Sequence, residues 1–273
     1  MSMDSKLFFQ HLYNELEENN SLYPYYKLNR GSIAQQQFRK AYYLQRLNYI
    51  DRHVDRSIHP AIWDCGCGFG STCFYFAMNG IASRGTTIEF YIDQIETRKK
   101  YWNRFGNAEL FEYAYENLFD NPPAEEKYDY IILQDTLHHI EPLDKALAIF
   151  YRSLKKGGKL ILVEENGSSI IRSLILYLKR GNKRVIKIYD NILQKNILLG
   201  NENIRSEKKW LKAFANTPFQ LDPESIQYFR FFMPFMFNSH NLEQKIEREQ
   251  QYWVQKNFVK RYGFFGINMV FIK

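Results

Sequence analysis

The 273-residue sequence predicts an α/β fold, in which a doubly wound, mostly parallel sheet carries an N-terminal helical flap and a helical lid insertion. Three features indicate this fold. Short apolar runs alternate with helical stretches from residue 59 onward, which is the order expected of parallel strands joined by crossover helices. The apolar run at 61–65 leads directly into a glycine-rich turn. The helical stretch at 143–154 ends in two lysines and two glycines before another apolar run begins.

The first part of the chain is expected to be helical. Apolar residues recur at helical spacing over 7–16 and again over 38–50, on either side of a break at 21–31. The length of the chain suits one core domain with a cover rather than several domains. We therefore expect residues 1–57 to form an N-terminal helical flap and residues 58–273 to form the main domain.

The predicted strands are short apolar runs that turn residues separate from helical stretches. They span residues 61–65, 86–90, 128–133, 159–164, 225–231 and 266–272. The alternation breaks twice. The segment 167–203 is basic and rich in aliphatic residues, and the segment 234–262 is polar with scattered aromatic residues. We expect both segments to be insertions on one side of the domain that form a lid.

The composition indicates a globular protein that holds something apolar. Hydrophobic residues make up 45% of the chain and charged residues 25%, as in ordinary globular proteins, whereas the aromatic share of 17% is high. No apolar run approaches the roughly 18 residues that span a bilayer, and the first residues lack the pattern of a signal peptide. These features favour a cytoplasmic protein.

Three cysteines, Cys65, Cys67 and Cys73, fall within nine positions. Their number is odd and their clustering is unsuited to disulfides that staple a fold, so we expect reduced thiols. No second Cys/His pair stands at metal-ligand spacing. The sequence therefore predicts no metal site.

The net charge of +7 is concentrated in one segment. Between residues 171 and 195 there are seven basic residues and one acidic residue, Asp190. The basic residues are Arg172, Lys179, Arg180, Lys183, Arg184, Lys187 and Lys195. Such a patch suits nucleic acid, an anionic membrane or an acidic protein, and it is also typical of a solvated helix face.

The strongest local signal is the apolar run at 61–65 followed by Gly66, Gly68 and Gly70. Glycine is needed where the backbone turns tightly and approaches a ligand closely, and the helix that follows presents free N–H groups to a carboxylate or phosphate. A dinucleotide fingerprint would have its third glycine at Ser71, and a phosphate-binding P-loop would end in Gly-Lys-Ser/Thr, which is absent. The spacing disfavours both of those sites.

The strand and turn resemble motif I of the class I S-adenosylmethionine-dependent methyltransferases, especially the group that includes the ubiquinone and biotin biosynthesis methyltransferases. The resemblance continues with Glu89, nineteen residues after Gly70, then with the run at 128–140 and the turn at 154–160. It covers roughly residues 61–165. It implies a seven-stranded Rossmann-like sheet, S-adenosylmethionine as cofactor and S-adenosylhomocysteine as product.

The resemblance also implies which residues hold the cofactor. Glu89 is expected to accept the ribose hydroxyls, and Phe90 to pack on adenine. Where the family places an aspartate for the adenine amino group, this chain has Ala114. The backbone there, with Glu116 or Asn117, is expected to hold the base instead. The predicted cofactor residues are Asp64, Cys65, Gly66, Cys67, Gly68, Gly70, Glu89, Phe90, Ala114, Tyr115, Glu116, Gln134 and Asp135.

Methyl transfer is an in-line displacement at a sulfonium carbon, so the protein must align the acceptor and exclude water. A base helps when the acceptor is a hydroxyl, phenol or amine, and the candidates by position are His138, His139 and Glu165. Paired histidines at this place also serve as loop and packing residues. Tyr25 and Tyr26 belong to an aromatic cluster that would either line an apolar substrate pocket or form ordinary core.

The leading hypothesis is a methyltransferase that acts on O or N of a small aromatic or lipid-like metabolite, with 167–203 as its lid. The basic segment would then dock an acidic carrier protein that bears the substrate, or touch a membrane surface. An RNA methyltransferase is the second hypothesis, but the sequence contains no recognisable RNA-binding module. A non-catalytic protein that binds S-adenosylmethionine is the third, because cofactor binding does not prove turnover.

Overall fold

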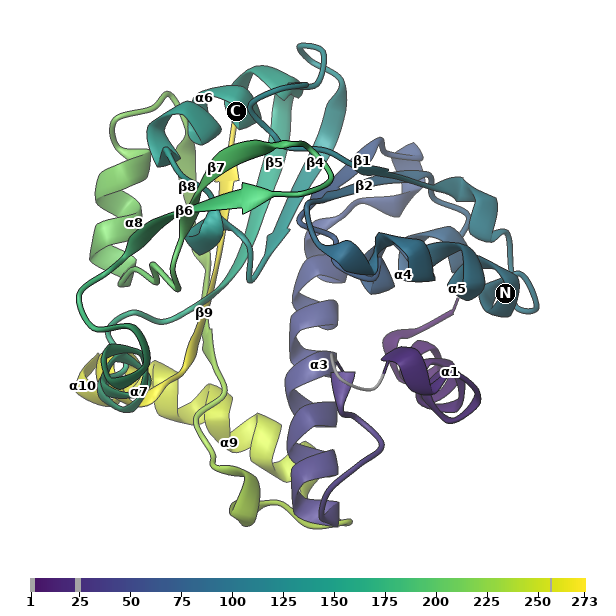
Figure 1. Cartoon of the computed structure of the whole chain (residues 1–273). Helices are drawn as coiled ribbons and strands as arrows, with labels where there is room; N and C mark the ends of the chain where they lie inside the picture. Colours follow the sequence, from purple (N-terminus) through teal and green to yellow (C-terminus); the bar gives the residue numbers. More distant parts are fainter. Residues whose placement is uncertain (1–2, 23–25, 256) are drawn as a thin grey trace.

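The computed structural model describes residues 3–22, 26–255 and 257–273, without the side chains of residues 90, 91, 253–255 and 257. Its centre is a seven-stranded mixed sheet in the order β3-β2-β1-β4-β5-β9-β8 (Figure 1). Neighbouring strands from β3 to β5 run parallel, and β9 is antiparallel to both β5 and β8. The predicted α/β class with a mostly parallel sheet is therefore confirmed.

The strands of this sheet are β1 (Ile62–Cys65), β2 (Ser83–Thr87), β3 (Phe111–Tyr115), β4 (Tyr128–Gln134), β5 (Leu154–Glu165), β8 (Gln220–Phe229) and β9 (Gly266–Ile272). The α-helices of the described residues are α1 (Ser5–Glu18), α3 (Ile33–His53), α4 (Ser71–Met78), α5 (Gln94–Trp102), α6 (Leu143–Ser153), α7 (Ile170–Arg180), α8 (Glu207–Phe214), α9 (Leu242–Gln255) and α10 (Asn257–Gly263). Short 3₁₀ helices are η1 (Asn20–Leu22), η2 (Arg56–Ile58), η3 (Phe90–Asp93), η4 (Ala108–Leu110), η5 (Leu137–His139) and η6 (Pro234–Met236).

Helices cover both faces of the sheet, because successive strand side chains point to opposite faces. Ile62 of β1 joins an apolar core with α1, α3, α4 and α5, and its neighbour Trp63 joins a second core with α6 and α8. Both strand residues are buried. The central strands therefore read as continuous apolar runs, which is why the sequence revealed them.

The N-terminal helices are α1 and α3, as predicted. Helix α3 begins with a capping box in which Ser32 and Gln35 satisfy each other's backbone N–H groups. A fully buried ion pair joins α1 to α5, with Glu15 Oε2 2.7 Å from Arg98 Nη2. Arg98 also donates to the carbonyl of Phe69, 2.7 Å away in the glycine-rich turn. Arg98 thus links the flap to the turn.

The predicted boundaries of three strands were wrong. Strand β5 begins at Leu154 and not at residue 159, and β2 and β8 are also displaced. Strand β2 begins at Ser83 and ends at Thr87, whereas 86–90 was expected, so Phe90 lies in η3 instead. The strand has the sequence SRGTT and shows no apolar run; its burial depends on pairing, and Trp63 Nε1 donates to Thr86 Oγ1 at 2.9 Å. Strand β8 begins at Gln220 and not at residue 225. The first half of the strand was missed because it is only partly buried beside β9.

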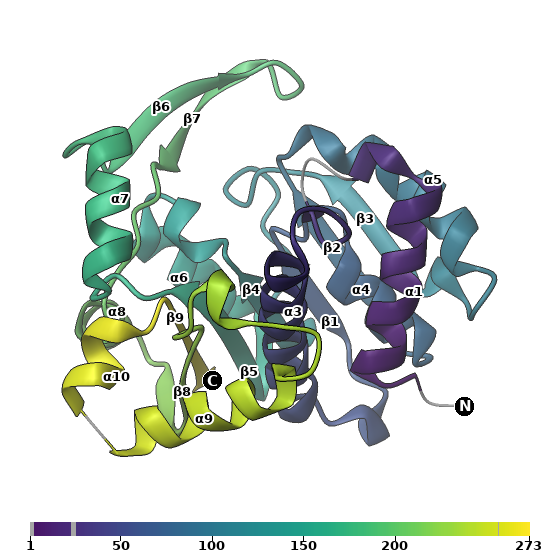
Figure 2. The ribbon, with the colours of Figure 1, turned by 90° about the horizontal axis from the view of Figure 1, so that it is seen from below.

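The segment 167–203, which was predicted as a helical lid insertion, contains a strand pair as well as a helix. Helix α7 is followed by an antiparallel hairpin of β6 (Val185–Asp190) and β7 (Lys195–Gly200). Figure 2 shows α7 and this hairpin projecting from one edge of the molecule. The segment 234–262 forms η6, α9 and most of α10. Among the described residues, no helix is both long enough and apolar enough to span a bilayer.

Candidate active site

The glycine-rich turn joins the end of β1 to the start of α4. Gly66, Gly68 and Gly70 have φ values of +86°, +52° and +75°, a region that side-chain-bearing residues rarely adopt. A Cβ on Gly66 would lie 2.2 Å from Thr136 Cγ2, and one on Gly70 would lie 2.3 Å from the ring of Phe111. The backbone conformation therefore favours glycine at all three positions, and close packing requires it at Gly66 and Gly70 as well.

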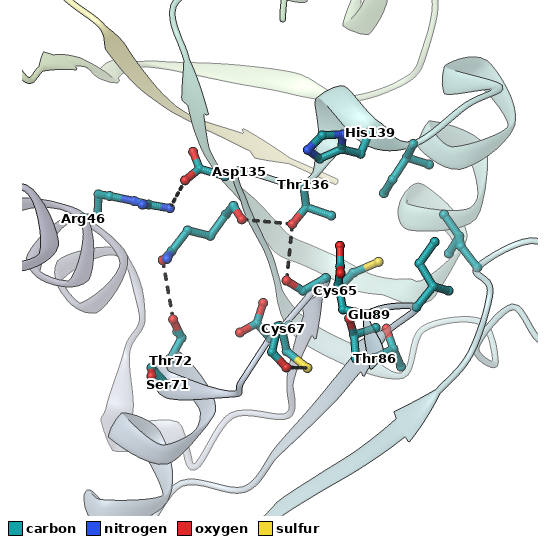
Figure 3. A pocket seen from close by; sticks show the side chains of 18 of the residues that line it. Arg46, Cys65, Cys67, Ser71, Thr72, Thr86, Glu89, Asp135, Thr136 and His139 are labelled. Atoms are coloured by element: carbon teal, nitrogen blue, oxygen red, sulfur yellow. Dashed lines mark hydrogen bonds and ion pairs between the residues drawn. The ribbon is translucent and has the colours of Figure 1, made fainter. Parts of the chain in front are cut away.

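A cavity of about 680 Å³ opens above this turn, at the carboxyl ends of β1, β2 and β4 (Figure 3). That end of a parallel sheet is where ligands bind in doubly wound folds. Helix α3 forms one wall, with Phe38, Tyr42 and Tyr43, and β7 contributes Ile197 and Leu198. Its size lies within the usual range of small-molecule sites.

Most of the predicted cofactor residues line this cavity. They are Asp64, Cys65, Gly66, Cys67, Gly68, Glu89, Glu116, Gln134 and Asp135. Three others are not among its lining residues. Gly70 lies beneath the turn against Phe111, and Ala114 and Tyr115 belong to β3. The side chain of Phe90 is outside the described part of the chain.

The expected adenine end differs in detail from the sequence prediction. The hydroxyl of Tyr115 lies 2.8 Å from both the carbonyl of Ile88 and Asp190 Oδ2, so this side chain faces the hairpin. Both carboxylate oxygens of Glu116 accept from Arg84, at 2.8 and 2.9 Å. The cavity wall after β3 is formed by Glu116 and the three residues that follow it, Asn117, Leu118 and Phe119.

Two buried carboxylate oxygens in the cavity wall have no hydrogen-bond partner within the described residues. They are Oδ1 of Asp64 and Oδ1 of Asp135. Burial raises the pKa of Asp64 to about 7, and Asp135 Oδ2 pairs with Arg46 at 2.6 Å. Acceptor oxygens without a partner suit a ligand that brings N–H donors, such as the ammonium group of an amino acid. Together with the glycine turn and Glu89, they fit S-adenosylmethionine.

The two adjacent histidines have different environments. His138 is buried, and its Nδ1 lies 2.5 Å from Oε2 of Glu164, a carboxylate that is itself fully buried. Glu164 raises the pKa of His138 to about 9 against the opposing effect of burial. His139 lines the cavity, and its Nδ1 donates to the carbonyl of Gly200 at 2.8 Å. Burial, with the nearby His138, lowers the pKa of His139.

This geometry separates the three predicted catalytic candidates. His139 is uncharged at neutral pH, and its Nδ1–H is fixed by Gly200, which leaves Nε2 as a proton acceptor at the cavity. His138 is charged and enclosed. Glu165 is not part of the cavity wall and pairs with Arg172 at 2.5 Å, while burial raises its pKa.

Three side chains each place one potential metal-ligand atom within 4.8 Å of the other two. They are His138, His139 and Glu202, the only such group in the described part of the chain. Nε2 of His138 is 3.9 Å from Oε2 of Glu202. A protonated His138 between Glu164 and Glu202 accounts for this arrangement without an ion. The three predicted reduced thiols are free, and burial raises their pKa values.

The part of the cavity wall that α3 supplies was largely missed in the sequence. Of the two predicted substrate residues, Tyr26 lines the cavity and its hydroxyl lies 2.5 Å from Ser71 Oγ, while Tyr25 is outside the described residues. Phe38, Tyr42 and Arg46 line the cavity from α3. Their spacing of four residues places them on one helix face, and this is the signal that could have identified them.

The sheet order, the glycine turn after β1 and the acidic residue after β2 together define a methyltransferase-like α/β fold. A family model described as "Methyltransferase domain" matches residues 63–162. Over these residues the chain thus contains an S-adenosylmethionine-dependent methyltransferase domain, as predicted.

Individual relatives are distant. An uncharacterized protein of Synechococcus sp. is 28% identical over 129 residues, which are 46% of this chain and 31% of that protein. The PH0226 protein of Pyrococcus horikoshii is 16% identical, with a TM-score of 0.55 over 94% of this chain and 98% of that one. Phosphoethanolamine N-methyltransferase 2 of Haemonchus contortus, solved with S-adenosyl-L-methionine, is 15% identical, with a TM-score of 0.54 over 84% and 52%. The chain thus spans about a third of the first relative and half of the last; the two structures share its fold.

Proposed function

We propose that this protein transfers a methyl group from S-adenosylmethionine to an oxygen or nitrogen of a small aromatic or lipid-like acceptor. The observation that carries the proposal is the position of His139, an uncharged imidazole in the wall of the cavity that the glycine-rich turn also lines. We also propose membership of the ubiquinone and biotin group, which the glycine turn and Glu89 support. In this proposal the segment 167–203 acts as a lid.

The cofactor, when bound, would supply a methyl group on its sulfonium sulfur, and the residues of the chain bind and orient the reactants. Asp64 and Asp135 offer carboxylate oxygens to the amino-acid end. Glu89 offers its carboxylate to the ribose. The backbone at Gly66 and Gly68 approaches the ligand closely because neither residue has a side chain in the way.

The remaining cavity wall favours an acceptor with an apolar body. Tyr42 and Tyr43 of α3 lie on one side and Ile197, Leu198 and Leu199 of β7 on the other. Burial raises the pKa of both phenols, to about 12 for Tyr42 and higher for Tyr43, so both stay neutral. An aromatic ring or alkyl chain fits between such surfaces, which also exclude water from the transfer.

His139 then removes the proton of the acceptor. Its Nδ1–H is held by the carbonyl of Gly200, so Nε2 carries the lone pair that accepts a proton from a hydroxyl, phenol or ammonium group. Burial, together with the enclosed cation of His138, lowers the pKa of His139 and so keeps it uncharged. A base that is already neutral at physiological pH is available for each turnover.

Calorimetric titration with S-adenosylmethionine and S-adenosylhomocysteine tests the cofactor site. We expect Glu89→Ala to weaken the binding of both compounds at least tenfold, because a charge-assisted hydrogen bond contributes about that much to affinity. The matched control is Glu112→Ala, an exposed carboxylate on β3. If the wild-type protein binds neither compound, the proposal fails.

Release of S-adenosylhomocysteine from a panel of phenols, amines and alkyl alcohols tests the base. His139→Gln should lower kcat by 10²–10⁴, the usual contribution of a general base, with little effect on cofactor binding. His53→Gln is the matched control, because His53 is also half-buried with Nδ1 on a backbone carbonyl, that of Tyr49. Equal loss in both variants would contradict a catalytic role for His139.

A further inference from the structure

Helix α7 presents an apolar face to solvent. Six large apolar side chains of this 11-residue helix are exposed, by 38% to 75% of their surface. They are Ile170, Ile171, Leu174, Ile175, Tyr177 and Leu178. At about 100° per residue they cover an arc of roughly 160°, whereas Leu176 lies outside this arc and is buried. A helix on a globular domain normally turns its apolar stripe inward, so this outward face is one that a partner would cover.

Cations follow the apolar face directly along the chain. The exposed ones are Lys179, Lys183, Arg184 and Lys187. No acidic residue occurs from 170 to 189. Two other basic residues of the segment are engaged inside the protein, Arg172 with Glu165 and Lys195 with Asp120. The four exposed cations and the six apolar side chains of α7 together form what we name the interfacial face.

We propose that the interfacial face docks onto the surface of an anionic lipid bilayer, with α7 lying in the plane of the headgroups. A broad apolar arc followed by several cations and no acids is the composition of helices that bind in this way. Phosphate headgroups complement the cations, while the acyl region takes up the isoleucine and leucine side chains. A nucleic acid would engage the cations but leave the aliphatic side chains in water.

The same insertion also walls the cavity. The hairpin begins five residues after α7, and β7 contributes Ile197, Leu198 and Leu199 to the cavity lining. Figure 2 shows the helix and the hairpin on the same edge of the molecule. Docking through α7 would therefore bring this wall of the cavity close to the bilayer. This inference rests on the proposed function, and it specifies the methyl acceptor as an amphiphile that is taken from the membrane.

Vesicle co-sedimentation with the full chain tests the proposal without cofactor or turnover. Phosphatidylcholine vesicles with about one third phosphatidylglycerol should bind the protein, and pure phosphatidylcholine vesicles should bind it much more weakly. Lys183→Glu/Lys187→Glu should weaken binding by thirtyfold or more, because each basic residue near an anionic surface contributes about a factor of five. Leu174→Glu/Leu178→Glu should abolish it, and both exposed side chains are replaceable without loss of core.

The matched control is Lys208→Glu/Lys209→Glu, the same charge change at exposed positions of α8, which should bind like wild type after allowance for net charge. Equal loss in this control would overturn the proposal, since it would assign binding to overall charge. Absence of wild-type binding to anionic vesicles, or retention only by an acidic carrier protein, would also overturn it. Either failure leaves the calorimetric and turnover tests of the proposed function unaffected.

Discussion

Replacing Glu15 tests how the N-terminal flap is held to the glycine-rich turn. Glu15 and Arg98 are both buried, and Glu15 accepts from Arg98 Nε at 2.8 Å, Arg98 Nη2 at 2.7 Å and Trp102 Nε1 at 2.9 Å. Removing one partner of such a pair leaves an uncompensated buried charge, which costs about 3–5 kcal/mol. We expect Glu15→Ala to lower the free energy of unfolding by that amount, a large share of the roughly 5–15 kcal/mol of a typical domain.

Urea unfolding followed by tryptophan fluorescence measures this change, since Trp102 lies beside the pair. Glu15→Gln, which keeps the shape of the side chain, should cost less than Glu15→Ala and provides a folded variant if Glu15→Ala does not fold. Glu18→Ala is the matched control on the same helix, because Glu18 pairs with Arg104 in solvent. A loss for Glu15→Ala no greater than that for Glu18→Ala would refute the reasoning.

The remaining predictions concern pH. The pKa of His138 is about 9 in the folded state, above its usual value of about 6.5, so this group contributes stability below pH 6.5 that is lost as the pH rises through 9. His138→Gln should flatten that part of a plot of unfolding free energy against pH; an unchanged slope would contradict the Glu164 pair. Because the pKa of Asp64 is raised to about 7, cofactor affinity should fall as the pH drops below 7. Asp64→Asn should weaken cofactor binding in calorimetry yet raise the thermal midpoint, and a fall in both would be contrary evidence. With its pKa lowered, His139 should keep kcat constant from pH 7 down to below 6.5, and a fall that begins above pH 7 would exclude it as the base.

The sequence predicted the central sheet and the glycine turn because both depend on local patterns. Ile131, Ile132 and Leu133 form an uninterrupted apolar run that only a buried strand explains, and Gly66 and Gly68 stand at a spacing that few sites use. Strand β2 was misplaced because its residues are polar or small, and its burial comes from neighbouring strands that lie far away in sequence.

The parts of the cavity wall that α3 and β7 supply could not be derived in the same way. Arg46 and Asp135 are far apart in the chain and meet only after α3 packs over the sheet. The hairpin strand β7 was predicted as part of a helical lid insertion, because the whole segment 167–203 is basic and rich in aliphatic residues. Contacts across the fold, rather than spacing along the chain, decide which of these side chains reach the cavity.

The attachment of β7 to the histidine loop links access to chemistry. Gly200 sits so close to the loop that a Cβ there would lie 2.0 Å from the carbonyl of His138, and Leu199 pairs with Ile140 as an isolated bridge. If the hairpin swings away to admit an acceptor, it withdraws the carbonyl that fixes the ring of His139. With the hairpin open, His139 would be misoriented, and with the hairpin closed it would be oriented to accept a proton. Methyl transfer would therefore take place only after the cavity has closed.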